Sequence, residues 1–523
     1  MTGTSAARIE EPTESPPAGI WSLDLPDEAA TATLARLVAE ILRPGDLVAL
    51  AGSLGSGKTT LARAMIRTLA DDPDLEVPSP TFTLVQGYDT PAGPVAHADL
   101  YRLGSQADLV EIGFEDLVDQ GIVLVEWPDR AGPGLPADRL DIVLGLDPAG
   151  GPGARRAEII GRGGFAARVD RMRALRELFL RSGWAEARRV PMQGDASSRA
   201  YERLVRPDGR TAILMISPPR ADGPPIRRGK SYSALAKLAE SVHAFVAMDR
   251  GLRALGFSAP VIYGEDLEAG LLILEDLGAE PVVDENGPIP ERYAEATRLL
   301  GRLHSVDLPG VLPVAEAIDR PLPDYDLGAL LIEVELLADW YVPHISRSQL
   351  SGSSRAEFVN LWADTLVELF NTPTTWTLRD YHSPNLIWLP KRQGLARVGV
   401  LDFQDAVLGH PAYDVASLLQ DARVTVPADL ELRLLGLYAV ERKAANPDFD
   451  VTAFARHYAI LGAQRATKIL GIFARLDKRD RKPAYLAHLP RVEAYLARNL
   501  AHPALERLRD WYAATLPHLA DED

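Results

Sequence analysis

The spacing of apolar positions divides the chain into two parts that differ in their expected secondary structure. From about residue 20 to residue 160, short apolar runs typical of buried strands alternate with segments of helical periodicity. Because strands and helices alternate along the chain, this part is expected to form an α/β domain. The expected elements are a helix over 27–42 and strands over 46–51, 121–126, 140–146 and 157–160.

The second part begins near residue 166 and becomes mostly helical from residue 291 onward. It is expected to open with a helix over 168–182, followed by short strands over 201–205, 211–216 and 270–274. This order predicts a small mixed lobe, 166–278, and a large helical lobe, 279–523.

Residues 1–19 are rich in Thr, Glu, Ser and Pro and have neither a basic start nor an apolar core. They are therefore expected to form a disordered tail rather than a signal peptide. The remaining boundaries give a first domain over 20–165 and a second over 166–523.

Composition excludes several classes of function. The 523 residues carry a net charge of −17, which disfavours extended binding to a nucleic-acid backbone. The chain has no cysteine, so disulfides and thiolate chemistry are excluded, and its ten histidines show no zinc-type spacing. No apolar stretch approaches the roughly 20 residues of a membrane span. We therefore expect a soluble protein of the reducing cytoplasm that does not bind a membrane.

Residues 52–59 read Gly-Ser-Leu-Gly-Ser-Gly-Lys-Thr, which is the P-loop pattern, between an apolar strand and a helix. Gly52, Gly55 and Gly57 allow backbone N–H groups to face phosphates. Lys58 can reach the β- and γ-phosphates, and the Thr59 hydroxyl can hold Mg²⁺. The loop therefore predicts binding of a nucleoside triphosphate, with Lys58 as a catalytic residue.

A second metal contact is expected at Glu126, because residues 121–126 form an apolar strand that ends in this carboxylate. P-loop proteins place an acid beside the magnesium in this way. Two polar segments, 78–83 and 97–102, lie between the loop helix and this strand, in the interval where such proteins keep segments that sense the γ-phosphate. By their chemistry alone they are only candidates for that role.

Taken together, residues 52–60, 79–84, 97–102, 111–115 and 125–128 resemble the TsaE family, the ATPase of bacterial tRNA threonylcarbamoyladenosine biosynthesis. The resemblance covers about residues 20–165. It implies ATP and Mg²⁺ as cofactors and docking on a complex of TsaB and TsaD, with tRNA involved only indirectly.

The same resemblance assigns roles to individual residues. It implies Mg²⁺ ligation by Thr59 and Glu126, a nucleotide contact for Thr31 and a switch role for Asp99. Ser53 departs from the family pattern, which commonly has an acid there. The residues implied to bind phosphate are Gly55, Ser56, Gly57, Lys58, Thr59 and Thr60.

The second part carries a pair of motifs typical of protein-kinase-like folds. Asp380 precedes Asn385 by five residues, and after a hairpin an apolar strand ends in Asp402. Asp380 would orient the substrate hydroxyl as the catalytic residue, while Asn385 and Asp402 would hold the metals that neutralise the transferring phosphoryl group.

Two further segments complete the expected kinase site. Residues 194–199 are expected to cover the phosphates, with Ser197 and Ser198 at the nucleotide. Residues 274–278 form the expected hinge between the lobes, which places Glu275 among the nucleotide-binding residues. The fold class predicted for the whole chain is thus an α/β P-loop NTPase domain fused to an α+β protein-kinase-like, bilobal domain.

Residues 194–201, 378–389, 402–406, 411–418 and 464–473 resemble the aminoglycoside-phosphotransferase-like sugar kinases, over about residues 170–515. The nearest group is AmgK, the anomeric kinase of N-acetylmuramate and N-acetylglucosamine in cell-wall recycling. This resemblance implies ATP, Mg²⁺ and an amino-sugar substrate. The shared motifs also admit a kinase of another small alcohol.

One departure from the kinase pattern leaves a second alternative open. The strand lysine expected in 211–216 is replaced by Met215. Either another cation, such as Arg199 or Lys230, meets the phosphates, or this half is a non-catalytic binding or regulatory module. For the first half, a small GTPase-like switch is the alternative, although the chain has no guanine-reading Asn-Lys-x-Asp motif.

Overall fold

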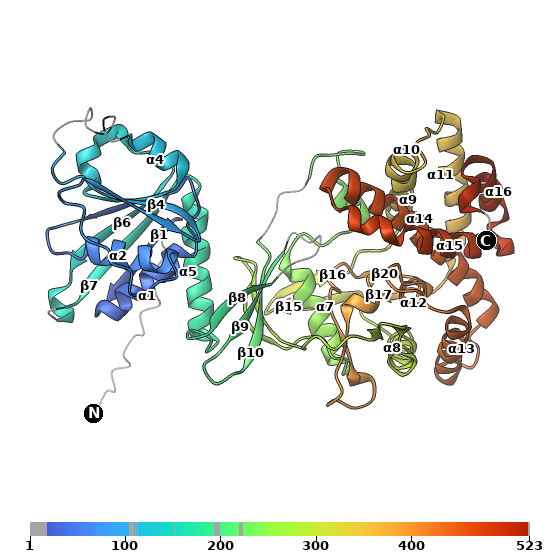
Figure 1. Ribbon diagram of the computed structural model, residues 1–523. Coiled ribbons are helices and arrows are strands. Elements are labelled where there is room, and N and C mark those ends of the chain that lie inside the picture. The colour runs from blue at the N-terminus through green and yellow to red at the C-terminus, as the bar shows by residue number, and fades with distance from the viewer. Residues whose placement is uncertain are drawn as a thin grey trace, which may run out of the picture. The chain divides into compact units, whose positions relative to one another are not determined.

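The computed structural model describes residues 18–103, 109, 111, 113–151, 153–192, 199–218 and 223–520. The chain forms two compact units, Met1–Ala185 and Glu186–Asp523 (Figure 1). Residues 1–17, which make up most of the expected disordered tail, lie outside the described residues.

In its described part, the first unit is built on a seven-stranded mixed sheet in the order β1-β7-β6-β2-β5-β4-β3. Strands β6, β2, β5 and β4 run parallel, and the remaining pairs are antiparallel. The expected α/β domain is therefore confirmed. Its elements are β1 (Ile20–Leu25), α1 (Glu28–Ala39), β2 (Leu47–Gly52), α2 (Lys58–Leu69), β3 (Val85–Thr90), β4 (Gly93–Asp99), α4 (Phe114–Gln120), β5 (Ile122–Glu126), β6 (Arg139–Leu146), β7 (Arg155–Arg162) and α5 (Phe165–Arg181).

The central strands of this sheet are buried on both faces. In β2, Val48 and Leu50 contribute to the core beneath α1, α2 and α5, while Leu47 and Ala49 contribute to the core on the side of α4. Successive side chains of a strand point to opposite faces, so a continuous apolar run fits a strand covered on both sides. The buried β2 delivers the P-loop at its carboxyl end.

Helix α5 packs on the first unit, which corrects the boundary expected at residue 165. Its Phe165 and Val169 are buried in the core of that unit, and Asp170 accepts a hydrogen bond from the Gly19 backbone N–H at 3.0 Å. Arg168 also pairs with Asp46 at the start of β2. The helix itself was expected, but helical periodicity does not indicate which domain the apolar face contacts.

The second unit begins with an antiparallel five-stranded sheet in the order β11-β12-β10-β9-β8, as described. Helix α7 is almost entirely buried, with Phe245 and Met248 in the core. The elements of this part are β8 (Arg188–Met192), β9 (Ala200–Val205), β10 (Thr211–Ile216), α6 (Tyr232–Ala236), α7 (Val242–Ala254), β11 (Ile262–Asp266) and β12 (Leu271–Glu275).

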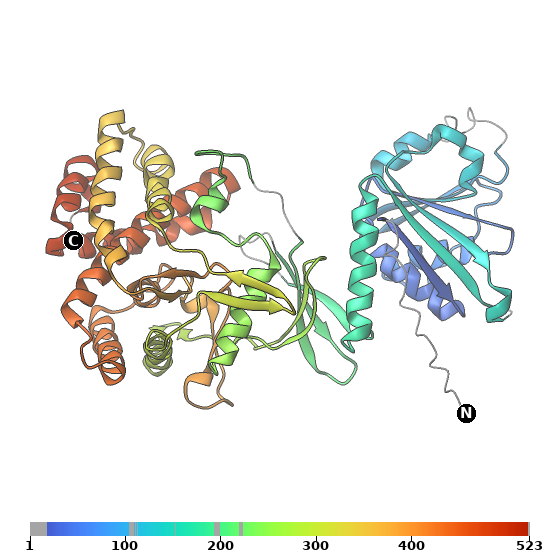
Figure 2. The same cartoon turned by 180° about the vertical axis from the view of Figure 1, so that it is seen from behind.

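The rest of the second unit is mainly helical, and its described part contains four two-stranded antiparallel sheets. These are β13 (Val283–Asp284) with β14 (Gly287–Pro288), β15 with β16, β17 with β20, and β18 with β19. A 30-residue helix, α14, runs through this part (Figures 1 and 2). The main elements are α8 (Pro290–Leu303), β15 (Val311–Ala315), β16 (Ile318–Pro321), α9 (Leu327–Leu336), α10 (Val342–His344), α11 (Gly352–Leu366), β17 (Thr375–Thr377), β18 (Leu386–Trp388), β19 (Val398–Val400), β20 (Val407–Gly409), α12 (Ala412–Leu419), α13 (Ala428–Ala445), α14 (Val451–Asp480), α15 (Leu489–Leu500) and α16 (Glu506–Thr515).

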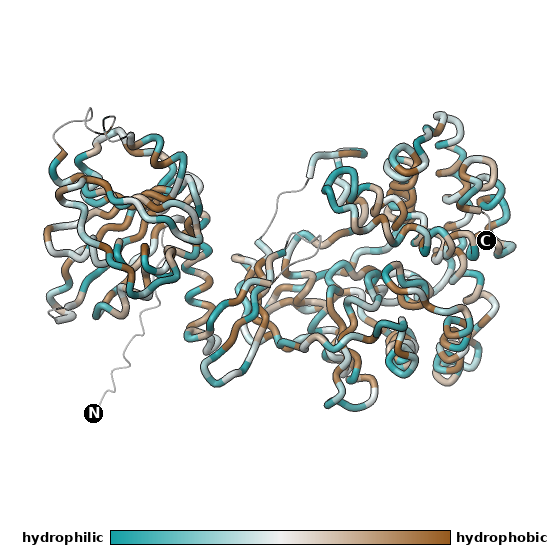
Figure 3. The backbone as a smooth tube through the Cα atoms, viewed as in Figure 1, coloured by the Kyte–Doolittle hydropathy of each residue, from teal (hydrophilic) through white to brown (hydrophobic). Residues whose placement is uncertain are grey.

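One apolar core connects the sheet and the helices of the second unit. It includes Met215 on β10, Phe245 on α7 and Phe403 in the loop between β19 and β20, and the rings of Phe245 and Phe403 stack at 4.8 Å. Hydrophobic positions gather inside each unit in Figure 3. Across the described residues, none of the helices combines the length and the apolar composition that a membrane span requires.

Candidate functional sites

The P-loop adopts a backbone conformation that favours glycine. Gly52, Gly55 and Gly57 have φ values of 141°, 79° and 103°. A Cβ atom on Gly52 would lie 2.3 Å from the Leu144 carbonyl oxygen, so a larger residue does not fit there. The turn leads directly into α2, whose N-terminal N–H groups can receive an anion.

Lys58 lies folded back on this loop. Its ammonium group donates to the carbonyl oxygens of Gly52 and Ser53 at 2.9 and 3.0 Å and lies 3.7 Å from the centre of the Trp127 ring. Burial lowers the pKa of Lys58, and the nearby carboxylates of Glu126 and Asp99 oppose that shift. The cation is thus kept at the mouth of the loop by neutral oxygens and an aromatic face.

The two predicted magnesium ligands of this unit lie together. The Thr59 hydroxyl donates to Glu126 Oε2 at 2.9 Å, because parallel pairing of β2 and β5 places Leu50 beside Glu126. The second carboxylate oxygen contacts His97 Nε2, also at 2.9 Å. A hydroxyl and a carboxylate are oxygen ligands that suit Mg²⁺, which usually keeps water and substrate oxygens as its other ligands.

The two polar segments expected to sense phosphate meet beside this pair. Asp99 is the neighbour of Glu126 in the register of β4 and β5, and Thr81 donates to Asp99 Oδ2 at 3.2 Å. Phe82, next to Thr81, is 85% exposed, and Leu54 at the tip of the P-loop is 84% exposed. Asp99 therefore links the segment 78–83 to the edge of the sheet that carries the P-loop.

A groove of about 610 Å³ runs between α1 and α2 and is lined by Thr31 and Thr60. The Thr31 side chain is nearly buried and donates to the Asp27 carbonyl oxygen at 3.3 Å. Ser56 is buried as well, and its hydroxyl has no partner among the described residues. The structure thus brings the predicted nucleotide contacts of the first unit to the P-loop and the adjoining groove.

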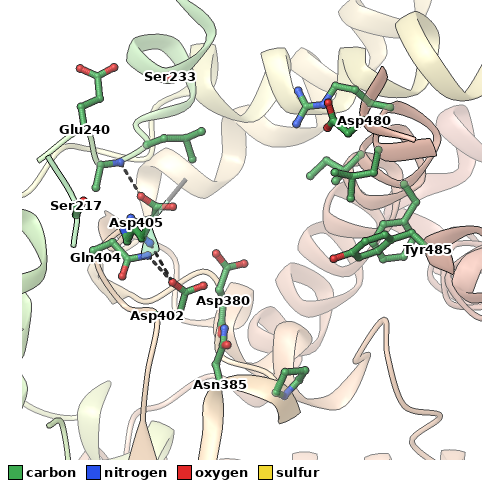
Figure 4. A pocket seen from close by; sticks show the side chains of 18 of the residues that line it. Ser217, Ser233, Glu240, Asp380, Asn385, Asp402, Gln404, Asp405, Asp480 and Tyr485 are labelled. Carbon is green, nitrogen blue, oxygen red and sulfur yellow. Dashed lines mark hydrogen bonds and ion pairs between the residues drawn. The ribbon is translucent and has the colours of Figure 1, made fainter. Parts of the chain in front are cut away.

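In the second unit, three predicted residues converge on a cavity of about 690 Å³. Asp380 and Asp402 point into this cavity, and Asn385 lies beside Asp380 (Figure 4). The Asn385 side-chain amide donates to the Asp380 carbonyl oxygen at 2.9 Å, while Gln404 donates to Asp402 Oδ1 at 2.7 Å. Carboxylates, an amide oxygen and room for phosphate oxygens form a donor set that suits Mg²⁺.

The surroundings of Asp402, a predicted metal ligand, disfavour its charged form. Burial raises the pKa of Asp402, and the charge of Asp380 adds to the rise, while Gln404 and Arg199 act in the opposite direction. Asp402 also has a positive φ of 56°, which is uncommon for a non-glycine residue. A cation bound between the two carboxylates would relieve their mutual repulsion.

Buried acids hold the loop that carries Asp380 in place. Asp414 on α12 accepts hydrogen bonds from the backbone N–H groups of Leu378 and Arg379 at 2.6 and 2.8 Å. Asp421 in turn accepts from the Ser383 N–H at 2.8 Å. These contacts fix the loop on both sides of Asp380.

Comparison with known proteins assigns each unit. The family model described as threonylcarbamoyl adenosine biosynthesis protein TsaE matches residues 25–150, and that of the phosphotransferase enzyme family matches residues 189–455. The chain belongs to both families. It joins a TsaE-family ATPase domain to a phosphotransferase domain, and the predicted fold class is confirmed.

Individual relatives agree with this assignment. The N-acetylmuramate/N-acetylglucosamine kinase of Caulobacter vibrioides is 40% identical over 348 residues, which cover 64% of this chain and 94% of that protein. The TsaE protein of Rickettsia typhi is 38% identical over 105 residues, which cover 20% of this chain and 72% of that protein. A solved ADP-bound aminoglycoside phosphotransferase, APH(2'')-Ib, aligns with 62% of this chain and 96% of its own at 11% identity and a TM-score of 0.38.

The phosphotransferase unit resolves which of the two candidate cations lies at the site. Met215 is buried in the core, whereas Arg199 lines the cavity and its guanidinium lies 3.3 Å from Asp402 Oδ1. Lys230 belongs to an exposed turn and is not among the described residues that line the cavity. Of the two candidate cations, Arg199 lies at this cavity and Lys230 does not.

Two other expectations for the phosphotransferase unit have different outcomes. Glu275 pairs with Arg392 at 2.5 Å and accepts from the Val261 N–H, so its side chain supports the end of β12. It is not among the described residues that line the cavity, and its nucleotide contact stays a prediction. Ser197 and Ser198 lie outside the described residues.

Sequence reasoning missed two residues that support the TsaE-family site. His97 belongs to the segment 97–102, where it was given no role of its own, yet it contacts Glu126 and lies two residues before Asp99 on β4. Arg155 on β7 donates to the Ser56 carbonyl oxygen at 3.1 Å. The two-residue spacing of His97 and Asp99 places both on the same face of the strand, and this was an available signal in the sequence. No local pattern connects Arg155 to the P-loop, which lies 99 residues earlier in the chain.

Proposed function

We propose that this chain is a bifunctional enzyme in which the TsaE-family unit hydrolyses ATP in support of tRNA threonylcarbamoyladenosine formation. The observation that supports this role is the convergence of Lys58, Thr59, Glu126 and Asp99 at the P-loop. Lys58 would neutralise the charge that develops on the phosphates, and Mg²⁺ held by Thr59 and Glu126 would polarise them. The partners we propose are TsaB and TsaD, with tRNA reached only through that complex.

We further propose that the second unit is an ATP-dependent kinase of N-acetylmuramate and N-acetylglucosamine that acts at the anomeric hydroxyl. The single observation that carries this proposal is the convergence of Asp380, Asn385, Asp402 and Arg199 in one cavity. The relative from Caulobacter vibrioides, with 94% of its length covered, supports the choice of sugar. A product of this kind would serve cell-wall recycling in the cytoplasm.

The chain's own residues suggest how the transfer would proceed. Asp380 would accept the proton of the anomeric hydroxyl while the sugar oxygen forms a bond to the γ-phosphorus of ATP. The bond between the γ-phosphorus and the oxygen that bridges it to the β-phosphate would break at the same time. Arg199 would neutralise charge on the phosphate oxygens. Asn385 and Asp402 would hold Mg²⁺, which supplies charge stabilisation when bound. The products are ADP and a sugar 1-phosphate.

The kinase proposal is tested by incubating the full chain with ATP, Mg²⁺ and a panel of amino sugars and small alcohols. We expect ADP release that depends on N-acetylmuramate or N-acetylglucosamine and that Asp380→Asn removes. Phosphorylation of a different alcohol alone would replace the proposed substrate. If no compound is phosphorylated and Asp380→Asn changes nothing, the unit is a non-catalytic module.

A further inference from the structure

A small chamber adjoins the kinase cavity at Asp380 and is lined by one face of α14. Its volume is about 140 Å³, and Asp380 and His382 line both this chamber and the larger cavity. Helix α14 contributes Arg465, Lys468, Ile469 and Ile472, which follow the spacing of neighbours on one helix face. A molecule whose hydroxyl faces Asp380 would therefore place its other substituents against this face.

The chamber is positively charged. It is lined by three cations, Arg423, Arg465 and Lys468, and by one carboxylate, Asp380. The charge of Lys468 is already matched, since its ammonium lies 2.9 Å from Glu333, which also pairs with the buried Arg379. Arg423 lies against the Tyr485 ring, with its guanidinium carbon 5.3 Å from the ring centre.

Arg465 is buried and makes no ion pair within the described residues, although its charge acts on the buried Asp414. The residue is 6% exposed, and its one hydrogen bond within the described residues runs from NH1 to the Gln420 carbonyl oxygen at 3.2 Å. Among those residues, no carboxylate lies within 4.0 Å of its guanidinium. A buried charge is costly unless it is paired, and a guanidinium matches a carboxylate with two parallel hydrogen bonds.

The guanidinium is also held in a fixed position. Gln420, whose carbonyl oxygen accepts from Arg465, exchanges side-chain hydrogen bonds with Asn499 at 3.0 and 2.8 Å. Both residues are buried. A receptor that is already oriented loses little conformational freedom when a ligand binds.

We infer that Arg465 binds a carboxylate carried by the sugar substrate and thereby determines specificity between N-acetylmuramate and N-acetylglucosamine. This inference rests on the proposed kinase function. The two sugars share the ring and the N-acetyl group, but N-acetylmuramate carries a lactyl ether whose carboxylate the other sugar lacks. Arg465 therefore serves as a specificity residue for the acid and contributes little to recognition of the neutral sugar.

The test compares kcat/KM for both sugars in wild type, Arg465→Met and Arg465→Lys. Because a hydrogen-bonded charge pair is lost, Arg465→Met should lower kcat/KM for N-acetylmuramate about 10- to 100-fold and affect N-acetylglucosamine far less. Arg465→Lys keeps the charge and should retain part of the preference. The matched control is Arg456→Met on the same helix, since Arg456 pairs with Glu368 at the surface.

A second probe changes the ligand. The methyl ester of N-acetylmuramate removes the charge from the ligand, so wild type should use the ester about 10- to 100-fold less well than the acid, whereas Arg465→Met should treat the two alike. Equal losses for both sugars in Arg465→Met, or a wild-type enzyme indifferent to the ester, would overturn the inference. A wild-type chain that phosphorylates neither sugar would instead overturn the proposed function, and the inference with it.

Discussion

Arg199 and Asp402, 203 residues apart in the sequence, form an ion pair at 3.3 Å in the kinase cavity. Asp402 comes from the loop after β19, and Arg199 directly precedes β9 in the sheet of the small lobe. The pair therefore places a cation beside the predicted metal ligand, whereas Met215 is buried in the core. This arrangement supports Arg199 as the group that meets the phosphates.

Arg199→Met should lower the kcat/KM of sugar phosphorylation about 100-fold, because a positioned cation at the transferring phosphate is removed. Arg199→Lys should recover part of the activity. Lys230→Met serves as the matched control and should change kcat/KM by less than about twofold, since Lys230 lies on an exposed turn. A large loss of kcat/KM in Lys230→Met with no loss in Arg199→Met would show that Lys230, and not Arg199, meets the phosphates.

Lys58→Ala should abolish ATP hydrolysis by the TsaE-family unit, since the cation that neutralises phosphate charge is lost. The hydrolysis is measured without sugar, in a chain that also carries Asp380→Asn to silence the kinase. With Asp380 intact, Lys58→Ala should leave sugar phosphorylation within about twofold of wild type, because the two sites lie in separate compact units and share no residue. Loss of both activities in a folded chain would contradict two independent sites.

Glu126→Gln should raise the Mg²⁺ concentration needed for half-maximal ATP hydrolysis about tenfold or more, because a charged ligand becomes neutral at the same size. The measurement is a magnesium titration of hydrolysis in the Asp380→Asn background. An unchanged titration curve would remove Glu126 from the metal site and leave it as a hydrogen-bond partner of Thr59 and His97.

Asp249 provides a prediction about stability and pH. This residue on α7 is buried, its Oδ1 has no partner within the described part of the chain, and burial raises its pKa to about 7. The folded state therefore prefers the protonated acid. Ionisation of Asp249 lowers the free energy of unfolding progressively as pH rises from about 4 to about 7, and the decrease reaches its full size above that range. Asp249→Asn should stabilise the chain more at pH 8 than at pH 5, by about 1–3 kcal/mol in unfolding free energy. Denaturant unfolding at both pH values measures this, and an equal effect at both would show that Asp249 is not the titrating group.

Local motifs predicted the parts of both sites that lie close together in the chain. Lys58 and Thr59 follow from the P-loop spacing, and Asp380 and Asn385 from their separation of five residues. Glu126 was found because an apolar strand that ends in an acid is itself a local signal. These residues could be predicted because their chemistry requires a fixed local backbone.

The contacts that the sequence did not predict are those made between distant segments. Glu275 was expected in the hinge, but the sequence did not predict that its side chain pairs with Arg392, 117 residues later. The docking of α5 depends in the same way on Asp46, 122 residues away from Arg168. Helical periodicity and hinge position predict that an element is present. The residues that its side chains contact are seen only in the folded chain.

The most direct test of the bifunctional account is an NMR spectrum of the product made by the wild-type chain from ATP and N-acetylmuramate. We expect a sugar phosphate whose phosphorus couples to the anomeric carbon, which is absent from the Asp380→Asn reaction and hydrolyses in dilute acid. Phosphorus coupled to carbon 6 would contradict the proposed position of transfer. No phosphorylated sugar from wild type would contradict the central claim that the second unit is a working sugar kinase.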